Sequence, residues 1–64
     1  MFKLEFSTDN AAFGDNDQET RAHEVQLILL RISAKLAHGD TFGAVKDSNG
    51  NTVGRWSLTY EGEV

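Results

Sequence analysis

Apolar and charged residues alternate strictly at the beginning of the chain. Phe2, Leu4 and Phe6 are separated from one another by single charged residues. Alternation with a period of two is typical of a strand that has one buried face. The pattern therefore predicts a strand over residues 2–7 whose three apolar side chains point into the core.

A long helix is predicted over residues 17–38. Asn16 is placed to act as the N-cap, with Glu19 three residues later completing a capping box, and Gly39 follows the last turn where a left-handed residue often ends a helix. The face expected to pack on a sheet comprises Ala22, Val25, Leu29, Ile32 and Leu36 with Ile28 at its border, whereas Glu24, Arg31, Lys35 and His38 are expected on the opposite side.

The same helix carries a second apolar stripe that a three-stranded sheet does not need. This outer stripe consists of Leu27, Leu30, Ala34 and Ala37 and is centred about 150° from the first. Loops could fold over it, since isolated exposed leucines are common. We favour a contact with a protein partner or a second copy, because leucines beside small alanines are typical of helix–helix seams. The residues expected to bind are Leu27, Leu30 and Ala34, together with Arg31.

Two strands over residues 41–47 and 52–60 are predicted to form a hairpin around Asp47-Ser48-Asn49-Gly50-Asn51. A two-residue turn at Asn49-Gly50 would pair residue 45 with 54 and turn residue 42 away from residue 56. A type I turn that begins at Asp47, with Gly50 in a left-handed bulge, pairs 42 with 56, 44 with 54 and 45 with 53. We choose the second register because it gathers Phe42, Ala44, Trp56, Leu58 and Tyr60 on one face.

These elements predict an α+β fold with a single domain over residues 1–64 and the order strand, helix, strand, strand. The last strand is the longest and carries Trp56, so we place it at the centre. The result is a three-stranded antiparallel sheet in the order 1-3-2, packed on one face by the helix. The alternative places the first strand parallel to the second through a right-handed crossover.

Composition limits the chemistry that the chain can perform. The sequence contains no Cys, which excludes disulfides and thiolate metal sites, and its two histidines would stand too far apart on one helix to share a metal. It also contains no P-loop, G-x-G-x-x-G or G-x-S-x-G motif. We expect no catalytic residues, no cofactor and no metal.

Charge and hydropathy bear on partners and location. The net charge of −4 argues against binding to nucleic acid, and the longest apolar run is too short for a membrane span or a signal segment. We therefore expect a cytoplasmic protein.

Acidic residues follow one another before and into the helix. Asp9, Asp15, Asp17 and Glu19 have no base among them, and the Asp47 turn is expected at the same end of the sheet. Acids at a helix N-terminus stabilise its dipole, and an aspartate at a turn start caps the turn. Alternatively, Asp15, Asp17 and Glu19 form an acidic surface that docks on a basic groove of a partner.

Residues 47–56 fit the pattern D-x-N-G-N-x-V-G-x-W, which resembles the ending of many short uncharacterised proteins encoded by bacteriophages and prophages. Residues 8–13, Thr-Asp-Asn-Ala-Ala-Phe, are similar to an early segment of the same proteins. With the helix between them, the resemblance covers nearly the whole chain. It implies a phage or prophage origin and a bacterial host cell, and it carries over no catalytic residues.

Small acidic phage proteins such as anti-CRISPR proteins often bind and block a host protein. By this analogy we expect a non-enzymatic protein-binding module that inhibits or modulates a host protein, such as a CRISPR or other defence component. The alternative is a structural or accessory protein whose outer stripe closes a homodimer.

Overall fold

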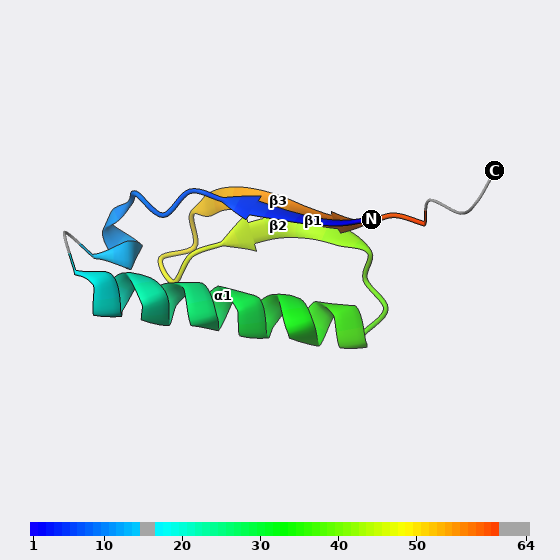
Figure 1. Cartoon of the computed structure of the whole chain (residues 1–64), viewed down its shortest axis with the longest axis horizontal. Coiled ribbons are helices and arrows are strands. Elements are labelled where there is room, and N and C mark those ends of the chain that lie inside the picture. The colour runs from blue at the N-terminus through cyan, green and yellow to red at the C-terminus, as the bar shows by residue number, and fades with distance from the viewer. Residues whose placement is uncertain (15–16, 61–64) are drawn as a thin grey trace.

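The computed structural model describes residues 1–14 and 17–60. Its elements are β1 (Phe2–Phe6), the 3₁₀ turn η1 (Ala11–Phe13), α1 (Gln18–Ala37), β2 (Phe42–Lys46) and β3 (Thr52–Leu58). The strands form one antiparallel sheet in the order β1-β3-β2, and α1 lies across one face (Figure 1). The predicted α+β class and strand order are confirmed, and the parallel alternative is wrong. No helix in the described ranges combines the length and apolar character needed to cross a membrane.

Asp17 is the N-cap of α1. One of its carboxylate oxygens accepts the backbone N–H groups of Glu19 and Thr20, and the other accepts the Thr20 hydroxyl at 2.6 Å. The Thr20 hydroxyl, followed by these backbone donors, holds the pKa of the Asp17 carboxyl below its ordinary value. Thr20 therefore stands three residues after the N-cap, at the position that the predicted capping box assigned to Glu19. Asn16, the predicted N-cap, lies outside the described residues.

The C-terminus of α1 ends as predicted, at a left-handed glycine. Gly39 has φ 94° and donates its N–H to the Leu36 carbonyl, while the Asp40 N–H reaches the Lys35 carbonyl. This pair of hydrogen bonds is the Schellman arrangement, which satisfies carbonyls that a helix end leaves without partners.

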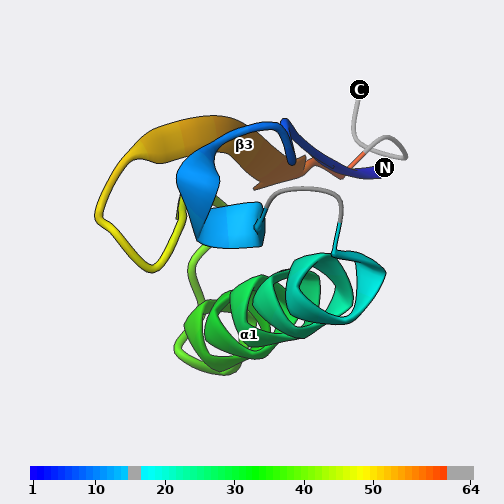
Figure 2. The same cartoon turned by 90° about the vertical axis from the view of Figure 1, so that its left-hand side faces the viewer.

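The core lies where η1, α1 and the sheet meet (Figure 2). Its buried apolar residues among those described are Phe13, Ile28, Ile32, Val45 and Trp56. Phe13 is completely buried and anchors the first loop in the core, and Asn10 caps η1 by accepting the Ala12 N–H. Trp56 sits between Leu4 of β1 and Gly43 of β2 in the register of the sheet.

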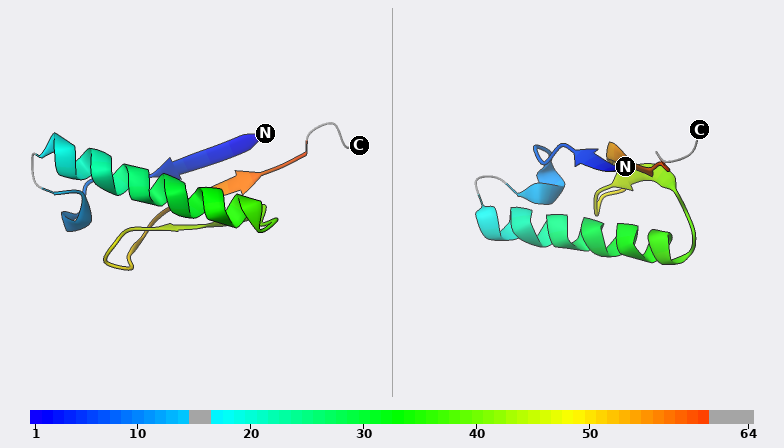
Figure 3. Two further views of the ribbon diagram at one scale, coloured as in Figure 1. Left: turned by 90° about the horizontal axis from the view of Figure 1, so that it is seen from below. Right: turned by 45° about the vertical axis from the view of Figure 1, so that its right-hand side comes forward.

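The helix presents a different face to the core from the one predicted. Its buried residues are Glu24, Ile28 and Ile32, whereas Leu29 and Leu36 are partly exposed. At 100° per residue this is a rotation of about 80°. The rotation follows from the position of α1, which packs against η1 and β2 and crosses the sheet obliquely (Figure 3). The prediction that Glu24 lies on the exposed side is wrong.

The hairpin combines the two registers that the sequence allowed. Asp47 begins the turn and Gly50 is left-handed with φ 85°, as predicted, so Lys46 pairs with Thr52. A bulge between Val45 and Lys46 then shifts the pairing by one residue, and Val45 pairs with Gly54.

The shift places Val45 rather than Phe42 beneath the helix. Gly43 and Val45 therefore share the inner face with Trp56, while Phe42 and Ala44 lie on the outer face beside Ser57 and Arg55. The expected cluster of Phe42, Ala44, Trp56, Leu58 and Tyr60 is accordingly wrong, because Phe42 and Tyr60 are strongly exposed.

Candidate protein-binding surfaces

A buried aspartate organises the hairpin turn. Asp47 is only 4% exposed, and its carboxylate accepts the backbone N–H groups of Asn49 and Asn51 and the side-chain amides of Asn51 and Asn10. The contact with Asn10, at 2.6 Å, spans 37 residues and ties the hairpin to the first loop. Asp47 therefore holds two turn residues, Asn49 and Asn51, and the η1 loop in one arrangement.

The surroundings of Asp47 also determine its titration. Burial disfavours the charged carboxylate, but the hydrogen bonds from Asn51, Asn10 and Asn49 outweigh that effect, so the pKa of the Asp47 carboxyl lies below its ordinary value. A carboxyl with a lowered pKa in the folded state stabilises the fold above its unfolded pKa of about 4. That contribution is lost as the pH falls through the folded pKa.

We expect acid to destabilise the wild type more than Asp47→Asn. The variant places an amide beside the amide donor of Asn10, so it is less stable at pH 5, but it no longer gains a proton on unfolding. Urea unfolding at pH 5 and pH 3 measures both effects, and Asp17 contributes equally to the two proteins. Parallel loss of stability in both proteins would contradict the role of Asp47.

Glu24 links α1 to the same hairpin. Its carboxylate accepts the Ser48 backbone N–H at 2.8 Å and the Ser48 hydroxyl at 2.6 Å, and Arg31 Nη2 lies 4.0 Å away. Glu24 is 4% exposed, whereas its donor Ser48 lies on the exposed hairpin and the Arg31 side chain is 43% exposed. No feature of the helix sequence distinguishes Glu24 from a solvent-exposed glutamate, and its role depends on where the hairpin lies.

Both buried carboxylates have structural roles. The acceptor positions of Asp47 and Glu24 are occupied by donors from the chain itself, which leaves them satisfied within the fold. In the ranges that the structure describes, no three His, Asp or Glu side chains gather as metal ligands would. We therefore assign no catalytic role to this cluster.

The two segments on which the family resemblance rests meet at this cluster. Asn10, from residues 8–13, donates to Asp47, the first residue of the hairpin pattern. Within that pattern Gly50 is left-handed, Gly54 touches β1, and Trp56 fills the core. Each of these residues has a conformational or packing role, so the pattern specifies the fold.

The residues expected to bind a partner differ in their exposure and contacts. Of the outer stripe, Leu27 is partly buried, whereas Leu30 is 58% exposed and Ala34 is exposed. Arg31 turns toward β2 instead, where it donates to the Lys46 carbonyl at 2.7 Å.

Two of the three residues of the predicted acidic surface, Asp17 and Glu19, are exposed in the structure. Asp17 uses its carboxylate to cap α1, and Glu19 is exposed in the first turn. Asp15 lies outside the described residues, and Asp47, at the same end of the sheet, is buried. Their role in docking stays a prediction.

An open apolar flank lies on the β1 side of α1. We define it as Phe2, Leu29, Leu36 and Leu58, whose residues are between 37% and 47% exposed. Arg31 faces β2 on one side of the buried line through Ile28 and Ile32. By helical geometry Leu29 and Leu36 lie on the other side, toward β1. Phe2 and Leu58 pair on the inner face of the sheet, where β1 extends beyond α1 (Figure 3).

A basic groove lies on the opposite side of α1, along β2. We call it the α1–β2 groove; it has a volume of about 350 Å³, an apolar floor and a basic rim. The floor consists of Ile28, Ile32 and Val45, and the rim of Arg31, Lys35 and Lys46. Sequence reasoning missed this groove, because only the rotated helix and the register shift between β2 and β3 bring these residues together.

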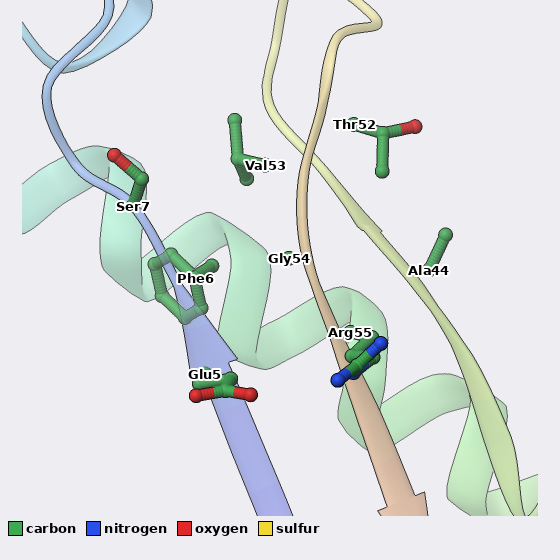
Figure 4. A pocket seen from close by; sticks show the side chains of 8 residues that line it. All are labelled: Glu5, Phe6, Ser7, Ala44, Thr52, Val53, Gly54 and Arg55. Carbon is green, nitrogen blue, oxygen red and sulfur yellow. The ribbon is translucent and has the colours of Figure 1, made fainter.

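A second hollow lies on the outer face of the sheet near the hairpin (Figure 4). It is open and has a volume of about 650 Å³, because Gly54 and Ala44 leave space between larger side chains. Glu5 and Arg55, which pair across β1 and β3, stand over it with opposite charges. This balance gives the hollow no preference for an anionic or a cationic ligand.

The chain matches no family model, and comparisons with curated proteins and with solved structures likewise give no match.

Proposed function

We propose that this chain is a non-enzymatic protein-binding module. The observation that carries the proposal is that more large apolar side chains are exposed than buried among the described residues. Scattered exposed apolar residues are ordinary, but four of these form the open apolar flank on facing sides of α1 and the sheet. A surface of this kind is typical of sites that are covered by another protein chain.

The resemblance to short phage and prophage proteins supports the biological side of the proposal. We propose that the protein acts in an infected bacterial cell and that its partner is a host protein, for example a CRISPR or other defence component. An acidic chain of 64 residues with a net charge of −4 suits inhibition by surface contact. This class of partner rests on the resemblance alone.

A second copy of the chain is the occupant that the open apolar flank favours. From Ala22 to Ala37, the side of α1 that carries Leu29 and Leu36 holds only uncharged residues, including Gln26 and Ser33. Because this flank carries no charge, two copies of it would not repel each other even though the protein is acidic. The small side chains beside Leu29 and Leu36 would let two helices approach closely. We therefore propose a homodimer closed by this flank.

Light scattering after size-exclusion chromatography tests the homodimer. At 100 µM we expect a mass of twice 7.1 kDa for the wild type and of one chain for Leu29→Asp. Leu30→Asp is the matched control, because it makes the same substitution on the outer stripe and should leave the dimer intact. Circular dichroism confirms that both variants are folded.

The other outcomes are equally informative. Dissociation by Leu30→Asp alone would assign the contact to the outer stripe. A monomeric wild type would exclude the homodimer, and if it also failed to bind the apolar dye ANS it would contradict a docking role for the flank.

A further inference from the structure

The basic residues of this acidic chain are concentrated at one place. Arg31, Lys35 and Lys46 line the α1–β2 groove, and they are half of the six basic residues in a chain with a net charge of −4. Arg31 lies near the buried carboxylate of Glu24, but its side chain is 43% exposed and retains further donors. The groove is therefore a basic site on an otherwise acidic molecule.

The strand beside this groove is an edge of the sheet. Among residues 1–14 and 17–60, the order β1-β3-β2 leaves β2 paired on one side only. The Leu58 N–H donates to the Thr41 carbonyl at 2.7 Å, which fixes the alternation of hydrogen bonds along β2. The N–H and C=O groups of Phe42 and Ala44 therefore point away from β3. An edge with free backbone groups can receive another strand.

One end of the free edge is closed by the protein itself. Arg31 donates to the Lys46 carbonyl, which points away from β3 in the same way. An added strand would accordingly pair with residues 42–44 and meet Arg31 where the pairing ends. This places a cation at the position where side chains of the added strand would enter the groove.

We propose that the α1–β2 groove binds an extended acidic segment of a protein partner, which joins the sheet as a fourth strand next to β2. Alternate side chains of the segment face the groove, where carboxylates meet Arg31, Lys35 and Lys46 and apolar atoms contact Ile28 and Ile32. The proposal rests on the proposed function and names its partner chemistry. The groove and the open apolar flank lie on opposite sides of α1, so dimerisation leaves the groove accessible.

A peptide fits these observations better than a nucleic acid. The free groups of Phe42 and Ala44 alternate as donor and acceptor, which matches the backbone of a strand and has no counterpart in a phosphodiester chain. The net charge of −4 also repels a long polyanion, whereas a few carboxylates engage only the local cations.

NMR titration of the ¹⁵N-labelled full chain tests the proposal. The probe is an eight-residue peptide of alternating valine and glutamate with blocked ends, and its control carries glutamine at every glutamate. We expect the largest amide shifts at Phe42, Ala44 and Lys46, and at least 5-fold weaker binding of the glutamine peptide. Raising the salt from 50 to 500 mM should weaken the acidic peptide several-fold.

Two variants distinguish the contribution of the backbone hydrogen bonds to peptide binding from that of the lysine charges. Ala44→Pro removes an N–H that points away from β3, a position where edge strands tolerate proline, and should reduce binding at least 10-fold. The double variant Lys35→Gln with Lys46→Gln keeps every backbone donor and should weaken binding about 5-fold. Lys3→Gln, on the outer face of β1, is the matched control and should have no effect.

Several results would overturn the proposal. Equal affinity for the glutamine peptide, or no effect of the lysine variants, would show that the basic rim does not recognise the carboxylates of the peptide. Equal affinity of the peptide for wild type and Ala44→Pro would show that the peptide does not pair with β2 as an added strand. Tighter binding of an eight-nucleotide single strand would show that the groove binds polyanions instead. Shifts confined to Phe2, Leu29 and Leu36 would move the contact to the open apolar flank, which leaves the protein-binding function standing.

Discussion

Gly54→Ala is expected to remove a large part of the stability of the fold. A Cβ atom at Gly54 would overlap the Glu5 carbonyl oxygen and lie 2.5 Å from both Cα and Cβ of Phe6. Real Cβ atoms essentially never approach other atoms so closely, and two of the three neighbours belong to the backbone of β1. The overlap can be relieved only by moving β1 away from β3, which would open the sheet above Trp56.

Thermal and urea unfolding followed by circular dichroism measure this effect. Insertion of one carbon into a packed interior costs about 1–3 kcal/mol, and we expect the upper end because backbone must move. A chain of this length has a total stability of roughly 3–10 kcal/mol, so Tm should fall by on the order of 15 °C or folding should fail.

Gly50→Ala is the matched control for Gly54→Ala. It makes the same substitution in the same hairpin, but a Cβ there meets nothing within 4 Å, and only the positive φ of 85° opposes it. Its cost should be about 1 kcal/mol. Equal destabilisation by the two substitutions would show that the approach of β1 to Gly54 is not what limits this position.

Gly54 also shows why the hairpin register escaped the sequence prediction. The turn was predictable because Asp47, Asn49 and Gly50 determine its hydrogen bonds within five residues. The bulge beyond it was not, because it depends on which residue lies opposite Gly54 and how closely β1 packs there. The sequence prediction assigned the buried face of the hairpin by its aromatic residues and so placed Phe42 in the core, whereas the structure places Val45 there.

The helix was misjudged for a related reason. Strand order and helix ends follow from local patterns or from simple chain connectivity. The buried face of α1 depends on η1, because Phe13 fills the space above the first half of the helix and α1 lies beside β2. The stripe through Leu29 and Leu36 was recognised as apolar, but it lines the open apolar flank.

The positions of the two binding surfaces likewise could not be predicted from the sequence. Leu30 was correctly predicted to be exposed, but Leu29 and Leu36, which were predicted to be covered by the sheet, are exposed as well. The basic rim joins Arg31 and Lys35 to a residue of β2, and this proximity arises only in the folded chain. Sequence patterns therefore indicated that the helix has more apolar surface than the core covers, but they did not show which side of the helix stays exposed.

Glu24→Ala should be the second severely destabilising substitution. It removes the acceptor for both the N–H and the hydroxyl of Ser48 and leaves Arg31 without its carboxylate neighbour. Removing the acceptor of two charge-assisted hydrogen bonds at this partly buried contact should cost about 2–3 kcal/mol, because the Ser48 backbone N–H and hydroxyl both lose their partner in the fold. The expected loss is therefore a large part of the total stability.

Urea unfolding followed by Trp56 fluorescence measures this loss, with Glu19→Ala as the control. Glu19 stands on the same helix and is exposed, so its replacement should change the free energy of unfolding by less than about 0.5 kcal/mol. Glu24→Gln keeps an oxygen acceptor and an amide that the Ser48 hydroxyl can face, and should lie between the two.

A double-mutant cycle with Ser48→Ala isolates the contact between helix and hairpin. If Glu24 stabilises the fold through Ser48, the two substitutions together should cost less than the sum of their separate effects, by about 1.5–3 kcal/mol. Strict additivity would mean that Glu24 stabilises α1 by another route. Coupling of this size would instead show that one buried glutamate holds the hairpin, and with it the free edge of β2, in place against the helix.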